Sequence, residues 1–519
     1  MRAAASRLAL VKAETGSTVR RGKIDRRVVI AALVYLGVGL AVSAGFATWN
    51  DEEYTLATTS HGVAYAFTRA INYELQAPLY FSALAAWRAL DHSVWFARLF
   101  SLLCATGFFL SLIAVGRRIA PGRDPLPFAA IVALNPYVAY AAFEIRLYAL
   151  SLVLSALMWI AFDAGYFSDE NDTRARWYFV AVAIVGVYVQ YFLAFLVAGF
   201  ACSLAVAGKW QTLRTYLAHA AVVALAAIPL ALVLRGQFGS DADASLPAQV
   251  LLRAEASSTI GFLFPYDPAW WWLMDHARAV YLCVAGASVV LLVLAKPRLS
   301  RTVLAYCACA LAVLALYAIA IVVLSLDLST RHFVAAFLPL AVAVYALFEA
   351  TSHSPNLRKL AFLPTIALTI AVLISRYRFL AQVEDWKRVA PFLAANVVAG
   401  DVIAIYPADA EPAFEREYHG NAPYVPWPRP YSTVRYSPTV SGIKSEAEAR
   451  AAFAKLSRYR HIWFVDDVEC LAVPRLGCDI VKDVVHSDFK IDLERQFYQS
   501  TVYELSDFAS EHSNAQGLR

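Results

Sequence analysis

The stretch from Trp49 to Tyr80 contains the side chains with the clearest capacity for chemistry. Two adjacent acids, Asp51 and Glu52, directly follow the first long apolar run of the chain. A carboxylate is costly to bury next to hydrocarbon, so an acid pair at this position indicates either a solvated helix cap or a working site. Asp is also a preferred helix N-cap residue, and spacing alone leaves both interpretations open.

The composition around these acids is that of a polytopic membrane protein. Of the 519 residues, 60% are hydrophobic and 16% are charged, whereas soluble globular proteins are roughly 45–50% apolar. The formal net charge of +5 is modest, and the basic residues are dispersed between apolar runs. Nucleic-acid binding is therefore not indicated.

Eleven apolar stretches are candidates for membrane spans, since a helix needs about 20 apolar residues to cross a bilayer and somewhat fewer inside a bundle. They are residues 28–47, 96–116, 126–141, 147–163, 177–190, 192–208, 215–234, 277–295, 302–325, 333–350 and 360–376. The centres of these stretches are almost free of charge and show no convincing repeat. A secondary transporter usually has ionisable residues or broken helices near the midplane. The sequence indicates neither, so a transporter is not favoured.

Basic residues indicate which turns face the cytoplasm, because cytoplasmic loops are enriched in Lys and Arg. With eleven alternating spans, one side holds the basic N-terminus (1–27), Arg117-Arg118, Arg174, Lys209, Lys296 and Arg358-Lys359. The turns of the opposite, outer side are the first outer loop (48–95), Glu144 to Tyr148, Gln190-Tyr191, the loop 235–276, Thr330 to His332 and the chain after Arg376. The polar chemistry is therefore predicted to converge on the outer face.

Several outer segments are expected to lie at the membrane surface. Glu53 to Arg69 is predicted to form one interfacial helix, and Pro78 to Leu90 a juxtamembrane segment too short to span. The loop 235–276 contains the run Trp270-Trp271-Trp272. This run is typical of interfacial anchoring, and a lid over a lipid-linked substrate is the alternative.

The chain after Arg376 predicts a small α/β domain over residues 377–519, of ordinary domain size. Its expected elements are helices at 384–398 and 445–456, a turn at Gly400-Asp401, and strands at 402–406 and 461–465. It has no Gly-rich phosphate loop, so a nucleotide site there is unsupported. Cys470 and Cys478 could form a disulfide if this domain faces an oxidising compartment.

Taken together, the outer turns resemble the GT-C superfamily of integral-membrane glycosyltransferases, in particular its bacterial branch related to protein O-mannosyltransferases and to the lipid A aminoarabinose transferase. The similar segments, in chain order, are Asp51-Glu52, Gln76 to Tyr80, Arg98 to Ser101, Glu144 to Tyr148, Val189 to Tyr191, Arg331 to Pro339, Asp385 to Lys387 and Gly400-Asp401. The fold expected from this resemblance is a polytopic α-helical GT-C-like module (28–376) of about eleven helices, followed by a periplasmic α/β domain.

The resemblance implies inverting transfer of a sugar from a polyprenyl-phosphate carrier to a lipid, glycan or protein acceptor on the periplasmic face of the bacterial inner membrane. Such a transfer needs a general base, for which Asp51 is the candidate, with Glu52 orienting the acceptor or a neighbouring cation. The donor phosphate needs cations, and Arg146 and Arg331 are the candidates because Arg offers phosphate a bidentate fork. The candidate substrate-binding residues are Glu74, Gln76, Tyr80, Glu144, Tyr148, Gln190 and Tyr191.

Each of these roles has a structural alternative. Arg146 could pair with Glu144, Arg331 could anchor at the interface, and Arg98 is expected to be structural or interfacial. No metal is expected to be required, although the Asp51 and Glu52 carboxylates could hold one divalent ion. The alternative functions are a transporter or flippase for lipid-linked sugars and a non-catalytic scaffold.

Overall fold

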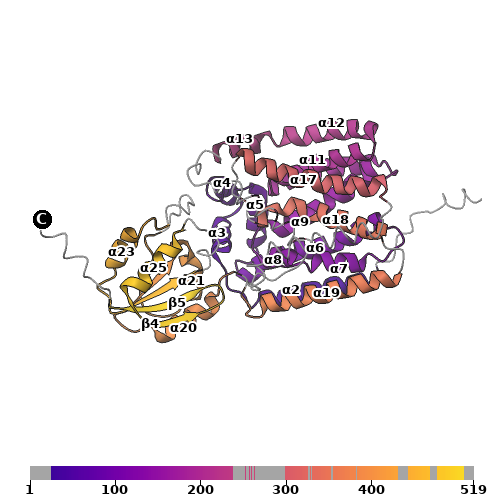
Figure 1. Cartoon of the computed structure of the whole chain (residues 1–519). Coiled ribbons are helices and arrows are strands. Elements are labelled where there is room, and N and C mark those ends of the chain that lie inside the picture. Colours follow the sequence, from indigo (N-terminus) through magenta and orange to yellow (C-terminus); the bar gives the residue numbers. More distant parts are fainter. Residues whose placement is uncertain are drawn as a thin grey trace, which may run out of the picture.

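The structure is a computed structural model that describes residues 25–237, 299–324, 328, 330–351, 355–381, 383–430, 442–467 and 476–507, with single positions at 252, 256, 259 and 262. Helices form a long bundle, and a small sheet domain, here called the C-terminal domain, lies at one end of it (Figure 1). The predicted span 277–295, nearly all of the loop after Gln237 and most of the basic N-terminus lie outside the described residues.

Apolar helices occupy the positions of the other ten predicted spans. The unbroken ones are α2 (Arg26–Ser43), α6 (Val94–Ile119), α9 (Tyr148–Phe162), α10 (Thr173–Val189), α11 (Leu193–Val206), α17 (Arg301–Leu324), α18 (Val334–Thr351) and α19 (Pro355–Tyr377). In the described part of the chain, five helices are long and apolar enough to cross a membrane, or up to seven if each bent pair is one span. The architecture is thus that of a multi-pass membrane protein, and the count of eleven stays a prediction.

Two of the predicted spans are broken helices, so the expectation that no span is broken is wrong. The span 126–141 consists of α7 (Leu126–Ala133) and α8 (Pro136–Phe143), which meet at 65°. The break follows from the sequence, because the side chain of Asn135 caps α8 by accepting a hydrogen bond from the Tyr137 amide, and Pro136 occupies the first turn. The span 215–234 consists of α12 (Trp210–Ala226) and α13 (Ile228–Gln237), bent by 51°.

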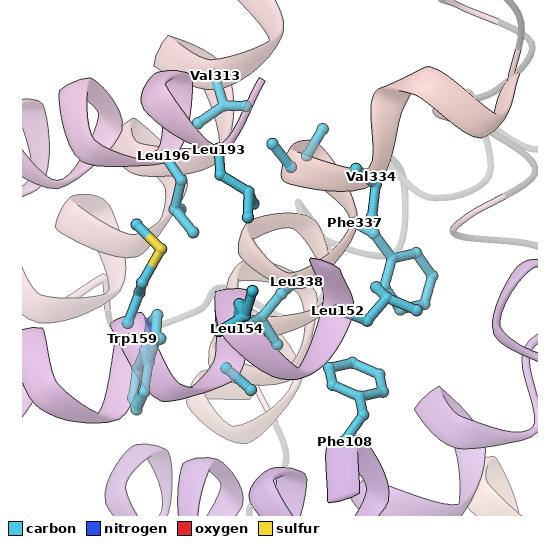
Figure 2. Close-up of a cluster of buried hydrophobic side chains, with 14 of the residues drawn as sticks. Phe108, Leu152, Leu154, Trp159, Leu193, Leu196, Val313, Val334, Phe337 and Leu338 are labelled. Carbon is cyan, nitrogen blue, oxygen red and sulfur yellow. The ribbon is translucent and has the colours of Figure 1, made fainter. Parts of the chain in front are cut away.

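The core of the bundle is built around α9. Leu152, Leu154 and Trp159 of this helix are buried among side chains of α6, α11, α17 and α18, as Figure 2 shows. Of the twenty residues from Tyr148 to Phe167, which include the π-helix η1 (Asp163–Phe167), about four fifths are buried inside the protein. The helix is therefore surrounded by protein rather than by lipid.

Three short helices of the first outer loop lie at the end of the bundle that faces the C-terminal domain (Figure 1). They are α3 (Asn50–Thr58), α4 (Val63–Asn72) and α5 (Pro78–Arg88). The prediction of one interfacial helix from Glu53 to Arg69 is wrong, because Gly62, with a φ of +85°, separates α3 from α4. Only α4 exposes large apolar side chains, and α3 is mostly buried.

The juxtamembrane assignment of the segment from Pro78 agrees with α5. This helix has 11 residues, so at 1.5 Å per residue it is about 16 Å long and too short to cross a hydrocarbon core of about 30 Å. Pro78 lies in its first turn, where a missing amide proton costs nothing.

The C-terminal domain is a five-stranded mixed sheet with the strand order β2-β1-β3-β5-β4. The strands are β1 (Val402–Tyr406), β2 (Tyr424–Pro426), β3 (Ile462–Asp466), β4 (Lys490–Gln496) and β5 (Thr501–Ser506). The helices are α20 (Trp386–Asn396), α21 (Glu411–Glu417), α23 (Glu446–Ala454) and α25 (Cys478–Asp488). Strand β1 pairs in parallel with β2 and β3, and β5 pairs in the antiparallel direction with β3 and β4.

Both faces of this sheet are covered. Val402, Ala404 and Tyr406 belong to the core under α23 and α25, whereas Ile403 and Ile405 belong to the core under α20 and α21. This follows from the alternation of side chains along a strand. The second core also includes Ala47 from the segment between α2 and α3, so the membrane module and the domain share packing.

The close packing of α11 against α17 generates a first prediction. A Cβ atom added to Gly199 would lie 2.8 Å from Cγ2 of Val313 and 3.1 Å from the carbonyl oxygen of Cys309. We expect Gly199→Ala to lower stability by about 1–3 kcal/mol, since overpacking a filled interface costs this much. The matched control is Gly37→Ala in α2, where a Cβ atom meets nothing within 4 Å. Equal thermal midpoints of the two variants in detergent would contradict the prediction.

Candidate functional site

The site is centred on the first turn of α3, where Asp51, Glu52 and Glu53 follow one another. The N-cap of this helix is Trp49, which makes no side-chain cap bond, and Asp51 lies inside the first turn. The interpretation of Asp51 as a plain N-cap is therefore wrong. Successive residues of an α-helix point about 100° apart, so the three carboxylates face three different parts of the protein.

The Glu52 side chain faces the bundle, and both of its carboxylate oxygens have partners there. Its Oε2 atom lies 2.8 Å from Nη2 of Arg98, and its Oε1 atom accepts a hydrogen bond of 3.0 Å from the Ile145 amide. Arg98 also donates to the carbonyl oxygens of Ser43, Phe46 and Ala47, which precede α3. The cation beside Glu52 is therefore Arg98, and the orienting role of Glu52 stays a prediction.

Asp51 faces two arginines that are far away in the sequence. Its Oδ2 atom lies 3.6 Å from Nη2 of Arg146 and accepts a hydrogen bond from Nη1 of Arg331. Arg146 follows α8, and Arg331 lies in the 3-10 helix η3 (Thr330–Phe333) before α18. Both predicted phosphate-binding arginines thus meet at the predicted base.

Arg146 is held by a second carboxylate, that of Glu74. Nη1 of Arg146 lies 3.1 Å from Oε2 of Glu74, whose Oε1 atom accepts a hydrogen bond of 2.7 Å from the Thr58 hydroxyl. Arg146 also donates to the Thr55 hydroxyl at 2.9 Å. The predicted pairing of Arg146 with Glu144 is not the one that forms, since Asp51 and Glu74 are its ion-pair partners.

Aromatic residues position the turn that contains Arg331. The Tyr137 hydroxyl donates to the Arg331 carbonyl at 3.2 Å, and the Tyr317 hydroxyl donates to the His332 carbonyl at 2.8 Å. The Arg331 guanidinium lies 5.4 Å from the centre of the Trp49 ring, within the range of a cation–π interaction. Arg331 is therefore fixed by α8, α17 and the N-cap residue of α3.

The acids of this cluster have opposite pKa shifts. Burial raises the pKa of Asp51, but the positive charges of Arg146 and Arg331 outweigh it and hold that pKa below its ordinary value. Burial raises the pKa of Glu144 well above its ordinary value and that of Glu74 less strongly, against the charges of Arg331 and Arg146 respectively. Carboxyl groups whose pKa values diverge in this way are suited to different proton-transfer roles.

Solvent access distinguishes the three acids of α3. The side chain of Asp51 is 16% exposed, against 2% for Glu52 and 8% for Glu53. Arg331 is 28% exposed, whereas Arg146 is 4% exposed. A ligand that approaches this end of the bundle would therefore reach Asp51 and Arg331 first.

The remaining predicted site residues lie around this cluster at different depths. Tyr80 in α5 is fully buried, and Tyr148, the first residue of α9, lies close enough to Arg146 and Arg331 to be influenced by their charge. Gln76 lies between α4 and α5, and Gln190 and Tyr191 form the turn between α10 and α11. In the described part of the chain, none of these three belongs to the ion pairs around Asp51.

The described residues contain no group of three His, Cys, Asp or Glu side chains arranged to hold a metal ion. The two neighbours that the sequence offered as a possible ion site, Asp51 and Glu52, instead face different arginines. The metal requirement stays a prediction.

Known structures with a similar arrangement cover most of the chain. ArnT from Cupriavidus metallidurans in the apo state is 12% identical and has a TM-score of 0.41, over 91% of this chain and 97% of that chain. Arabinofuranosyltransferase AftD from Mycobacteria is 14% identical and has a TM-score of 0.40, over 93% of this chain and 40% of that chain. The sequence matches no protein-family model and no curated protein. Both TM-scores are below 0.5, so the site is described here only from contacts within this chain.

Sequence reasoning missed the partners of α3 that lie outside the motifs. Arg416 of α21 pairs with Glu53, and Arg88 at the end of α5 donates to the Leu56 carbonyl near the end of α3. The run of three acids at 51–53 was a usable signal for Glu53, because a third acid in a buried turn needs its own partner. No local signal marks Arg416.

The buried pair of Arg98 and Glu52 generates a second prediction. We expect Arg98→Met to cost about 3–5 kcal/mol, because it leaves the Glu52 carboxylate buried without its partner. Adding Glu52→Gln should recover part of the loss. Arg27→Met, which removes exposed pairs with Asp25 and Asp124, should change the thermal midpoint little. A double variant no more stable than Arg98→Met alone would contradict the assignment.

Proposed function

We propose that this protein is an inverting glycosyltransferase that moves a sugar from a polyprenyl-phosphate carrier to an acceptor on the periplasmic face of the bacterial inner membrane. The observation that supports it best is the accessible Asp51 carboxylate, held beside Arg146 and Arg331 at one end of a bundle of apolar helices. A base and phosphate-binding cations are the two chemical elements that such a transfer requires.

In the proposed reaction, Asp51 accepts the proton of the acceptor hydroxyl as its oxygen attacks the anomeric carbon. The new bond from the acceptor oxygen to that carbon forms on the face opposite the phosphate, so the configuration inverts. The bond between the anomeric carbon and the phosphate oxygen breaks, and its electron pair goes to the phosphate. The lowered pKa of Asp51 keeps the carboxylate ionised and ready to accept a proton at neutral pH.

The departing phosphate would be stabilised by Arg331, which is the more exposed of the two arginines, and by Arg146, which lies deeper. A guanidinium has five N–H donors, so Arg331 can contact Asp51 and a phosphate together. The Nε atoms of both arginines are buried and have no hydrogen-bond partner within the described residues. Positive charge already in place lowers the barrier without reorganisation, and in this proposal no divalent ion is needed.

The buried acids Glu74 and Glu144 complete the proposed site. Glu144, with a raised pKa, is suited to remain protonated and to donate a hydrogen bond to a sugar oxygen, while Glu74 holds Arg146 in place. Tyr80, Tyr148, Gln76, Gln190 and Tyr191 are proposed to line the substrate path. The apolar helices would hold the isoprenoid tail of the donor.

The cysteines support the proposed periplasmic orientation of the C-terminal domain. Cys478 in the C-terminal domain is disulfide-bonded, and Cys470, its predicted partner, lies outside the described residues. Cys104, Cys202, Cys307 and Cys309, all in apolar helices of the bundle, are free thiols. A disulfide persists in an oxidising compartment, as expected for a domain outside the cytoplasm.

Asp51→Asn tests the assignment of the base. We expect this isosteric change to abolish transfer while donor binding persists, so that cells lose one sugar increment from a glycolipid or glycan and accumulate the polyprenyl-phosphate sugar. Mass spectrometry of envelope extracts measures both. The control is Asp91→Asn in the same outer loop. Asp91 is exposed, and its carboxylate accepts a hydrogen bond from the Ser93 amide. If deletion changed the glycans but Asp51→Asn did not, the transporter and scaffold alternatives would replace this proposal.

Arg331→Gln should move the acid limb of the pH profile. The Arg331 charge lowers the pKa of Asp51, so its removal raises that pKa, and activity is then lost at a higher pH as the pH falls. We expect the acid limb of kcat/KM to shift upward by on the order of one pH unit. Arg331→Lys, which keeps the charge, should retain the wild-type limb. If the acid limb of Arg331→Gln did not shift, Arg331 would not influence the pKa of Asp51 and the prediction would be wrong.

A further inference from the structure

The third acid of α3, Glu53, connects the site to the C-terminal domain. Arg416 of α21 donates two hydrogen bonds to its carboxylate, from Nε to Oε1 and, at 2.6 Å, from Nη2 to Oε2. The pair is bidentate, so it restricts orientation as well as distance. It joins residues 363 positions apart in the chain.

A second helix of the C-terminal domain holds the residues just before Asp51. Oε1 of Glu384, two residues before α20, accepts a hydrogen bond of 3.4 Å from the Asn50 amide. Lys387 donates to the Ala44 carbonyl at 3.0 Å. Ala47 packs in the core that contains Trp386 and Phe414. The domain thus contacts the chain on both sides of Asp51, the proposed base.

The bundle holds α3 by separate contacts. Arg98 binds Glu52, and Arg88 donates to the Leu56 carbonyl at 2.6 Å near the other end of the helix. α3 has only nine residues, and an isolated helix shorter than about 12–15 residues is marginal. Its position therefore depends on these polar contacts with the two parts of the protein.

Asp51 and Glu53 are two residues apart in the same helical turn, so a movement of Glu53 moves Asp51 as well. We propose that the C-terminal domain is a positioning element for the reaction, in which Arg416 holds Glu53 and thereby places the Asp51 carboxylate against Arg331. The inference rests on the proposed function, since Asp51 is the base in it. Glu53 and Arg416 are positioning residues and touch no substrate.

The kinetic test compares Arg416→Gln with Arg429→Gln. Arg429 forms an ion pair with Glu448 within the C-terminal domain and is about as exposed as Arg416, at 46% against 41%. We expect Arg416→Gln to lower kcat about tenfold or more with KM and donor binding unchanged, because small displacements of a reacting group reduce rate strongly. Arg429→Gln should keep the wild-type kcat. Arg416→Lys should recover part of the rate, since it keeps the charge without the fork.

A double variant tests whether Glu53 and Arg416 act together. If Glu53 and Arg416 act as one unit, the double variant Glu53→Gln/Arg416→Gln should lose no more rate than either single variant. A wild-type kcat in Arg416→Gln overturns the inference. So does a loss of rate matched by an equal loss of folded protein, because a purely structural role would produce it.

Hydrogen exchange separates this inference from the proposed function. The amides of residues 50–58 should exchange faster in full-length Arg416→Gln than in wild type or Arg429→Gln. If wild type transferred no sugar but exchange rose as expected, the proposed reaction would fail while the positioning of α3 by the domain stood. Unchanged exchange in Arg416→Gln would overturn the positioning itself.

Discussion

The structure of the site depends on the cost of placing carboxylates at a membrane boundary. Three successive acids in the first turn of α3 lie at the end of an apolar bundle, where an unpaired charge would be strongly destabilising. Each acid has its own arginine from a different part of the chain: Arg98 for Glu52, Arg331 with Arg146 for Asp51, and Arg416 for Glu53. The helix is short, and these ion pairs determine where it lies.

The three acids of α3 have similar side chains but different surroundings. Glu52 and Glu53 use both carboxylate oxygens in bidentate contacts and are nearly inaccessible, so they hold the helix. Asp51 shares its charge with two guanidinium groups and keeps access to solvent, so it can accept a proton. The same carboxylate chemistry thus gives one proposed base and two anchors, and the difference lies in the partners of each acid.

The bundle and the C-terminal domain both contribute to this arrangement. The helix α9 is buried on nearly all sides, and Tyr148 at its start lies close enough to Arg146 and Arg331 to be influenced by their charge. The shared core at Ala47 and the contacts of α20 and α21 with the start of α3 make the domain part of the site rather than an appendage. A rigid scaffold on two sides suits a reaction that depends on preorganised charge.

The sequence by itself determined the membrane class, the positions of the described apolar helices, and the strands β1 and β3, because hydrophobic periodicity is a local signal. It also indicated that Asp51, Arg146 and Arg331 would share one face, through alternation of the basic turns. It missed β2, β4 and β5 and joined α3 to α4, since edge pairing and a break at Gly62 depend on context. Only the tertiary structure decided which arginine pairs with which acid. Ion pairs between residues 46 to 363 positions apart follow from the packing of helices, and no local pattern contains that information.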